Sequence, residues 1–272
     1  GAFVVQKRII LANDLSGIGK VALTPAIPIM ACCQIETILL PTILLSSHTG
    51  GFQKIATQEL LDFTKQSLEQ WKALQLKTDA LFIGYCRQRE QLKVLLDYHT
   101  TQNPDALLIV DPIMGDHGKL YSGFTEEYVQ QMRKVCSKAD VILPNLTEAA
   151  LLTQTEYLEG IDPVEAYQEL ARKLANLGAK KVILTGIQIK VGSIGLLSYD
   201  AVTEQFATAF TPHYPHHFFG TGDIVSAILS ACILQGFSLE KALTLATTFL
   251  DATLQETIAQ EKDLQYGVAF EP

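Results

Sequence analysis

A glycine-rich tetrapeptide late in the chain has the residue types needed to activate an alcohol beside a phosphate. It is Gly220-Thr221-Gly222-Asp223, and an apolar run rich in Ala and Ser begins directly after it, at Ile224. Glycines let the backbone approach a ligand closely, and the free amides at a helix start form an anion site. Bound phosphate would repel a carboxylate unless the carboxylate had a task, and deprotonating an attacking alcohol is such a task. The alternative is that Thr221 or Asp223 only caps the helix.

A second cluster carries two carboxylates after an apolar run. Asp111 and Asp116 delimit the segment 111–116, which directly follows Leu107–Val110. Two carboxylates at the end of a strand could hold Mg²⁺, directly or through water. An ordinary Asp-Pro turn is the alternative.

A third cluster places an amide and a carboxylate three residues apart. Asn145 and Glu148 stand at the start of a predicted helix, so both can face one site. Glu148 could orient metal-bound water. The alternative is a plain helix N-terminus, with Asn145 or Thr147 as its cap and Glu148 favoured by the helix dipole. The presence of both carboxylate clusters in one chain, each after a predicted strand, favours the functional interpretation of both.

Two polar segments near the amino end suit recognition of a small polar substrate. The first, Asn13–Gly19, follows the apolar run Arg8–Ala12, and we predict a polar glycine turn there. It is not a P-loop, because Val21 follows Lys20 where that motif needs Ser or Thr. The second, Ser47–Gly51, could form another wall of the substrate pocket.

A histidine-rich stretch precedes the glycine-rich tetrapeptide. It contains His213, His216 and His217. A metal site is one interpretation, but we favour a loop packed beside a nucleotide.

Apolar runs and amphipathic segments alternate along nearly the whole chain, and this alternation predicts the fold. The predicted strands are Arg8–Ala12, Thr37–Leu45, Ala80–Tyr85, Leu107–Val110, Val141–Leu143, Lys181–Thr185, Ile194–Ser198 and Thr203–Ala209. The predicted helices are one ending near Cys33, then Gln58–Leu76, Glu90–His99, Thr125–Cys136, Thr147–Thr153, Asp162–Leu177 with an Asp162 cap, Gly222–Gln235 and Leu239–Glu256. Such an order indicates crossover connections and a mostly parallel sheet with helices on both faces. We therefore predict one α/β domain over residues 1–272, a three-layer α/β/α sandwich with a mostly parallel central sheet. Ligands of such sheets bind beyond the carboxyl ends of the strands, so the polar clusters should share one site.

Composition excludes several classes of protein. Of the 272 residues, 48% are hydrophobic and 18% charged, which excludes a disordered chain. A net charge of −8 argues against a nucleic-acid binder, which needs a cationic surface. The apolar stretches are too short to span a membrane. The five cysteines include no CxxC pair, and this odd number predicts a reduced, cytoplasmic protein.

The three motifs together resemble the ribokinase-like superfamily. Within it, the segments 13–19 and 47–52 are similar to those of the pyridoxal (vitamin B6) kinases, especially the bacterial pyridoxamine kinases. The segment Phe82–Tyr85 and the ending Gly267–Glu271 are similar too, so the resemblance spans essentially the whole chain. It implies ATP-dependent phosphorylation of the 5′-hydroxymethyl group of pyridoxal, pyridoxine or pyridoxamine, in salvage of pyridoxal 5′-phosphate.

The resemblance also implies roles for single residues. Asp223 would be the base, and the backbone amides of Gly220, Thr221 and Gly222 would steady the transferring phosphoryl group. Asp111 and Glu148 would organise Mg²⁺, while Asp116, Asn145 and Thr185 would lie along ATP. Asp14, Ser16, Thr49 and Tyr85 would surround the pyridine ring, and residues 117–123 would form a flap over the nucleotide. Such kinases are commonly homodimers and often use a monovalent cation such as K⁺.

The sequence departs from parts of this family at two places. Longer pyridoxal kinases carry a Ser-His pair where Asn13-Asp14 stands here. Some dual vitamin-precursor kinases have a Cys directly before the glycine-rich tetrapeptide, where this chain has His217-Phe218-Phe219. Two alternatives stay open: a hydroxymethylpyrimidine kinase of thiamin synthesis, and a non-catalytic nucleotide or vitamer sensor on the same fold.

Overall fold

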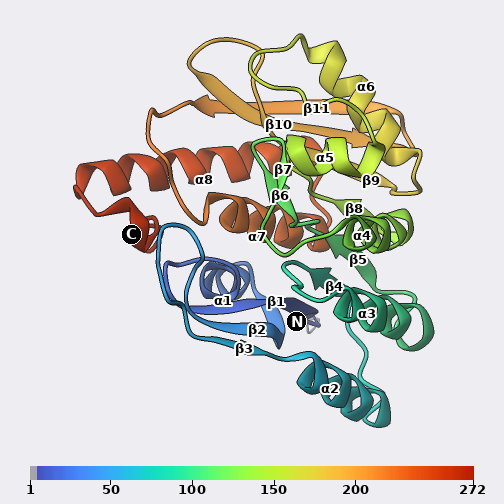
Figure 1. Ribbon diagram of the computed structural model, residues 1–272. Helices are drawn as coiled ribbons and strands as arrows, with labels where there is room; N and C mark the ends of the chain where they lie inside the picture. Colours follow the sequence, from blue (N-terminus) through green and yellow to red (C-terminus); the bar gives the residue numbers. More distant parts are fainter. Residues whose placement is uncertain (1–4) are drawn as a thin grey trace.

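The computed structural model describes residues 5–272, and strands alternate with helices along this part of the chain (Figure 1). The strands are β1 (Lys7–Ile18), β2 (Ile35–Ser47), β3 (Thr57–Glu59), β4 (Ala80–Ile83), β5 (Leu107–Val110), β6 (Gly115–Asp116), β7 (Lys119–Leu120), β8 (Val141–Ile142), β9 (Lys181–Ile187), β10 (Ser193–Asp200) and β11 (Gln205–Pro212). The α-helices are α1 (Leu23–Cys32), α2 (Leu61–Ala73), α3 (Arg89–Gln102), α4 (Glu126–Lys138), α5 (Leu146–Thr153), α6 (Val164–Ala175), α7 (Thr221–Leu234) and α8 (Leu239–Ala259). A 3₁₀ turn at Leu264–Tyr266 precedes the carboxyl end.

Nine strands form one sheet in the order β11-β10-β9-β8-β5-β4-β1-β2-β3. The six neighbours from β9 to β2 are parallel, whereas β3, β10 and β11 are antiparallel additions at the two edges. The remaining strands, β6 and β7, form a small hairpin of their own. The predicted mostly parallel sheet is confirmed.

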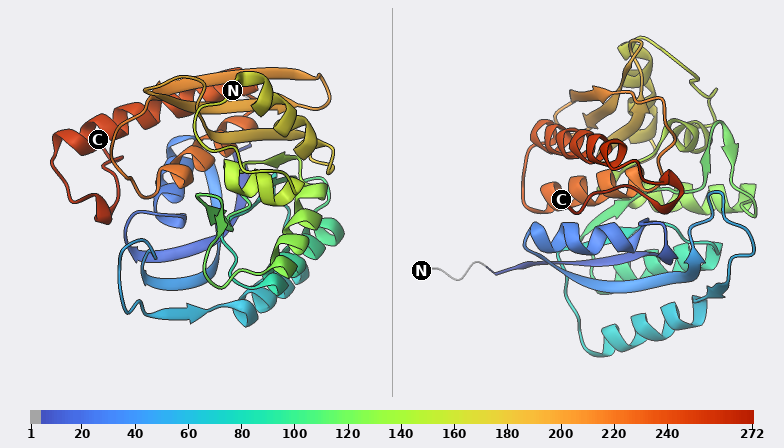
Figure 2. Two further views of the ribbon diagram at one scale, coloured as in Figure 1. Left: turned by 45° about the horizontal axis from the view of Figure 1, so that its top comes forward. Right: turned by 90° about the vertical axis from the view of Figure 1, so that its left-hand side faces the viewer.

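The helices cover both faces of this sheet. One buried cluster packs α2 to α6 against one face, and a second packs α1, α7 and α8 against the other. Figures 1 and 2 show these two helical layers on opposite sides of the strands. Side chains alternate between the clusters along a strand: Ile10 and Ala12 belong to the first cluster, and Ile9 and Leu11 to the second. The predicted α/β/α sandwich is thus confirmed.

The predicted glycine turn at Asn13–Gly19 is wrong for most of its length. The strand β1 continues through these residues and pairs with β2 as far as Ile18 opposite Ser47. A register shift between Asn13 and Leu15 interrupts the ladder. Such a bulge changes the direction of the side chains, and it leaves two successive polar residues, Asn13 and Asp14, both buried.

Two helix starts differ from the prediction. Residues 57–59 form the edge strand β3, so α2 begins at Leu61. At α6 the N-cap is Pro163 with extended backbone and no side-chain cap, so the predicted Asp162 cap is wrong. Ser238 caps α8, because its hydroxyl accepts the N–H of Lys241. In the described part of the chain, no helix combines the length and the apolar character needed to cross a membrane.

Candidate active site

The polar clusters predicted from the sequence meet at the carboxyl edge of the parallel strands. Asp14 lies near the end of β1, Tyr85 follows β4, and Asp111 follows β5. Asn145 follows β8 and forms an isolated bridge with Thr185 of β9. The start of α7 brings Asp223 to the same edge. The structure therefore brings these residues to one edge of the sheet.

The glycine-rich tetrapeptide forms the beginning of α7. Gly220 is the N-cap in the left-handed region, with φ of 86°. A Cβ there would lie 2.5 Å from the carbonyl oxygen of Lys20, so only glycine fits this close approach. The position of a Cβ on Gly222 faces open space instead. The free amides at this helix start can therefore approach an anion.

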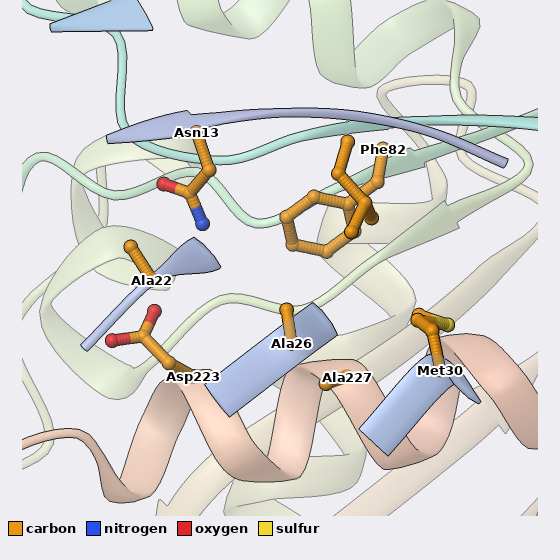
Figure 3. Close-up of a pocket in the computed structure, with 8 residues that line it drawn as sticks. Asn13, Ala22, Ala26, Met30, Phe82, Asp223 and Ala227 are labelled. Carbon is orange, nitrogen blue, oxygen red and sulfur yellow. The ribbon is translucent and has the colours of Figure 1, made fainter. Parts of the chain in front are cut away.

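Asp223 stands in the first turn of α7 and lies beside the β1–α1 turn. Ala22 of that turn and Asp223 line the same small cavity. Burial raises the pKa of Asp223, and the Ala22 amide opposes that rise. Asp223 lines a cavity of about 10 Å³, which has room for about one water molecule (Figure 3). Besides Asp223 and Leu11, six residues line this cavity. They are Asn13, Ala22, Ala26, Met30, Phe82 and Ala227.

Asp111 accepts a hydrogen bond from Ser226 of α7, a residue that the sequence analysis did not identify. The Ser226 hydroxyl donates to Oδ2 of Asp111 at 2.7 Å. Burial raises the pKa of Asp111 to about 7, and the charge of Asp223 adds to the rise while Ser226 opposes it. Ser226 is three residues after Asp223 on one helix, so helical spacing alone could have pointed to it.

Glu148 is fixed by a reciprocal cap at the start of α5. The N–H of Asn145 donates to Oε2 of Glu148 at 2.9 Å, and the N–H of Glu148 donates to Oδ1 of Asn145 at 2.8 Å. The other oxygen, Oε1, accepts the N–H of Met114 at 3.3 Å. The plain capping interpretation is thus correct as geometry, yet the carboxylate is 3% exposed and faces Asp111. Burial, and then the charge of Asp111, raise the pKa of Glu148 well above its ordinary value.

Asp116 and the predicted flap lie on the hairpin β6–β7. The side chain of Asn145 ties this hairpin to α5, because its Nδ2 donates to the carbonyl of Gly115 at 2.9 Å. The N–H of Gly118 donates to the Thr147 hydroxyl at 2.9 Å. Asp116 itself is half exposed and accepts the N–H of the next residue. The hairpin is therefore held against the start of α5, where Glu148 lies.

Asp14 forms the other side of the site. Its Oδ2 accepts the Ser16 hydroxyl at 3.0 Å. Burial raises the pKa of Asp14 to about 7, and the nearby charge of Asp223 contributes to the rise. Asn13 joins this strand to the next one, because its Oδ1 accepts the N–H groups of both Asp14, at 3.0 Å, and Tyr85, at 2.8 Å. Asp14, Ser16 and Tyr85 are thus brought together, as predicted.

The segment after β2 forms the remaining wall. The His48 ring accepts the N–H of Gly50 at Nδ1, 3.0 Å away, and its Nε2 lies 2.7 Å from the carbonyl of Gln265. A carbonyl can only accept, so Nε2 carries the proton. The ring also packs on Phe219, with 4.5 Å between ring centroids. Thr49 is exposed in this turn.

The three histidines before α7 do not gather into a metal site. Within residues 5–272, no cluster of three or more His, Cys, Asp or Glu side chains suits a metal ion. His213 contacts Gln188 through Nδ1 at 3.2 Å, and His217 packs edge-on against Phe219. All three histidines are exposed, and the favoured interpretation, a loop packed beside a nucleotide, stays a prediction.

A mostly parallel α/β/α sandwich with a glycine-rich helix start and several carboxylates at one sheet edge is typical of small-molecule kinases. Residues 31–267 match the family model described as phosphomethylpyrimidine kinase, and the chain belongs to this family within the ribokinase-like superfamily.

Several proteins of known name are similar to the chain over most of its length. The pyridoxal kinase of Arabidopsis thaliana is 32% identical over 244 residues, which are 83% of this chain and 74% of that protein. The crystal structure of pyridoxal kinase from Lactobacillus plantarum has a TM-score of 0.90 at 33% identity, covering 98% of this chain and 95% of that one. A Bacteroides thetaiotaomicron structure in a form with pyridoxal has a TM-score of 0.91 at 32% identity, covering 97% and 93%.

Proposed function

We propose that the protein transfers the γ-phosphoryl group of ATP to the 5′-hydroxymethyl group of a B6 vitamer. The observation that carries this proposal is the position of Asp223. Its half-buried carboxylate stands in the first turn of α7, close enough to Asp111 and to Asp14 for its charge to raise the pKa of both. The similarity to named pyridoxal kinases over most of the chain supports the choice of vitamer.

Asp223 acts as the general base in this proposal. Its raised pKa makes the carboxylate a better proton acceptor than an exposed Asp. The amides of Gly220, Thr221 and Gly222 meet the charge that develops on the transferring phosphoryl group. Phosphoryl transfer depends mostly on such positioning and charge stabilisation, so no covalent intermediate is needed.

The carboxylate pair fits Mg²⁺ as the ion that accompanies ATP. Asp111 uses Oδ2 for Ser226, and Oδ1 has no hydrogen bond among the described residues. Both oxygens of Glu148 accept backbone N–H groups, so Glu148 suits contact through water. A divalent ion that keeps several waters and shares substrate phosphates needs only such a pair, and it neutralises charge on the phosphates. Asp116, Asn145 and Thr185 line the nucleotide side, and residues 117–123 cover it.

The acceptor side is formed by Asp14, Ser16, Thr49 and Tyr85. Asp14 offers a buried carboxylate with one oxygen outside its hydrogen bond to Ser16, which suits a hydroxyl or a cationic nitrogen of the ring. Tyr85 is half buried and packs edge-on against Phe124, so its ring can form an apolar side of the pocket.

The proposal extends to the setting in which the enzyme works. Residues 1–272 form one kinase domain in a homodimer. The five free cysteines support a cytoplasmic location. A requirement for a monovalent cation such as K⁺ stays a prediction of the family resemblance.

A hydroxymethylpyrimidine kinase is the second candidate, because a Haemophilus influenzae protein named hydroxymethylpyrimidine/phosphomethylpyrimidine kinase is 29% identical to this chain over 180 residues. The two alcohols differ in their rings, so the Asp14 side of the site decides between them. The test is a side-by-side measurement of ATP consumption with Mg²⁺ and each of pyridoxal, pyridoxine, pyridoxamine and hydroxymethylpyrimidine, with products identified by mass. Faster turnover of the vitamers supports the proposal. Faster turnover of the pyrimidine refutes it in favour of the second candidate, and nucleotide binding with no turnover indicates a sensor.

A further inference from the structure

The last residues of the chain fold back over the turn between β1 and α1. We call residues 265–271 the C-terminal strap and residues 19–22 the β1–α1 turn. Val268 and Ala269 of the strap are fully buried, and the N–H of Ala269 donates to the Thr257 hydroxyl on α8 at 2.8 Å. A Cβ on Gly267 would lie 2.4 Å from the carbonyl oxygen of Gly19. The strap is therefore anchored on α8 and in close contact with the turn.

Lys20 is the side chain that joins the turn to the strap. Its Nζ lies 2.5 Å from Oε1 of Glu271 and 3.5 Å from the carbonyl of Val268. It also lies 5.6 Å from the centre of the Phe270 ring. Three different groups of one segment therefore hold a single ammonium group whose side chain is 27% exposed.

The backbone of the turn needs an external restraint. Gly19, Lys20 and Ala22 have φ angles of 120°, 51° and 52°. The left-handed region is unfavourable for residues with a Cβ, and such conformations persist only where the surroundings impose them. The contacts of Lys20 with the strap supply that restraint.

The same turn touches the catalytic end of α7 at two points. The carbonyl oxygen of Lys20 sits against Gly220, within 2.5 Å of where a Cβ would be. Ala22 lines the same small cavity as Asp223, and its backbone N–H lowers the pKa of that carboxyl group (Figure 3). A displacement of the turn would therefore change the surroundings of the base and the contact that shapes the anion site.

The strap reaches the acceptor wall as well. The carbonyl of Gln265 accepts the proton of His48 at Nε2, and His48 packs against Gly19, whose Cβ position would lie 2.0 Å from its ring. One segment thus restrains both the β1–α1 turn and the His48 segment that packs against it.

We propose that Lys20 is a positioning residue for phosphoryl transfer, through which the C-terminal strap holds the β1–α1 turn against Asp223 and Gly220. Lys20 acts through the turn and does not touch the reacting atoms. The kinetic consequence rests on the proposed function, whereas the restraint of the turn is a property of the folded chain alone.

The test compares Lys20→Met, Lys20→Arg and Glu271→Gln in the full-length chain. With ATP and pyridoxal as probes, we expect Lys20→Met and Glu271→Gln each to lower kcat about ten-fold, because small misplacements of reacting groups are costly. KM for ATP should stay within about two-fold, since the nucleotide side of the site is untouched. Lys20→Arg keeps the charge and should recover most of the kcat. The double variant Lys20→Met/Glu271→Gln should be no slower than Lys20→Met, because the two residues act as one pair.

Hydrogen exchange provides a readout that needs no activity. Peptides covering residues 17–23 should exchange faster in Lys20→Met and Glu271→Gln than in the wild type. The matched control is Lys65→Met, which breaks the surface ion pair of Lys65 with Glu90, 3.8 Å apart. It should leave both exchange and kcat unchanged. If the wild type fails to phosphorylate the vitamers but the exchange result holds, the proposed function is wrong and the restraint stands. Unchanged exchange at residues 17–23, or equal losses of kcat in Lys65→Met, would overturn the inference.

Discussion

Replacement of Asp14 by Asn should make the ligand-free protein more stable at alkaline pH while weakening acceptor binding. Asp14 is 8% exposed, and its hydrogen bonds come from the Ser16 hydroxyl and local backbone, with no cation among them. The charge that adds to the rise of its pKa is that of another carboxylate, Asp223. Asn has the same shape and no charge, so the substitution removes the repulsion and the burial of charge together.

The size of the effect follows from the pKa. Burial and Asp223 raise the pKa of Asp14 from 3.8 to about 7. Between these two pH values the folded protein holds a proton that the unfolded chain has lost, so this group makes the free energy of unfolding fall as pH rises. At about 1.4 kcal/mol for each pKa unit, the fall amounts to at most about 4 kcal/mol above pH 7. Asp14→Asn removes that fall, and a gain of this size raises Tm by up to roughly 10 °C in a chain of this length.

Scanning calorimetry of the ligand-free protein at pH 4 and pH 8 measures the difference. We expect Asp14→Asn to melt several degrees above the wild type at pH 8 and close to it at pH 4. Asp97→Asn on the exposed face of α3 is the matched control and should change neither value. In the kinase assay, KM for the acceptor should rise roughly ten-fold in Asp14→Asn, as for the loss of a hydrogen bond to a charged group. A variant no more stable than the wild type at pH 8 would refute the reasoning.

Three further substitutions test other parts of the site. Asp223→Ala should lower kcat by roughly 10²–10⁴, as for the loss of a general base, while calorimetric titration still detects nucleotide binding; unchanged turnover would remove Asp223 from the mechanism. Ser226→Ala removes the 2.7 Å bond to Asp111 and should raise the Mg²⁺ concentration for half-maximal rate roughly ten-fold, measured at saturating ATP and acceptor. Gly84→Ala would place a Cβ 2.5 Å from the Asn13 side chain, and because Asn13 is held by two backbone N–H groups, we expect about 1–3 kcal/mol of destabilisation in urea unfolding. A Gly84→Ala midpoint equal to that of the wild type would show that Asn13 can move.

Most of the fold could be predicted from the sequence because alternation of apolar runs with amphipathic helices leaves few arrangements. Leu107–Val110 is the same strand in the prediction and in the structure. The parallel order then places the segments after β1, β4, β5 and β8 at one edge. The grouping of Asp14, Asp111 and Asn145 followed from that rule, whereas Asp223 lies at the start of α7 after an edge strand and was assigned to the site by its own motif and the family resemblance.

The local details that the sequence did not predict depend on contacts between distant residues. The segment Asn13–Ile18 has the composition of a turn, yet pairing with β2 satisfies its backbone groups and keeps it extended. The bond of Ser226 to Asp111 joins residues 115 positions apart, and the ion pair of Lys20 with Glu271 joins the two ends of the fold. Local propensity carries no information on such pairs, because their partners are chosen by packing.

The active site has an energetic consequence for the whole chain. Asp14, Asp111, Glu148 and Asp223 are all carboxyl groups whose pKa is raised by burial. No lysine or arginine forms an ion pair with any of them in the described part of the chain. Each therefore lowers the stability of the ligand-free fold at neutral pH, and a site that evolved for stability alone would have replaced them. Ligands that bring positive charge to these groups stabilise the folded chain by the same interactions with which they bind, so Mg²⁺ should raise Tm more at alkaline pH, where the carboxyl groups are more ionised.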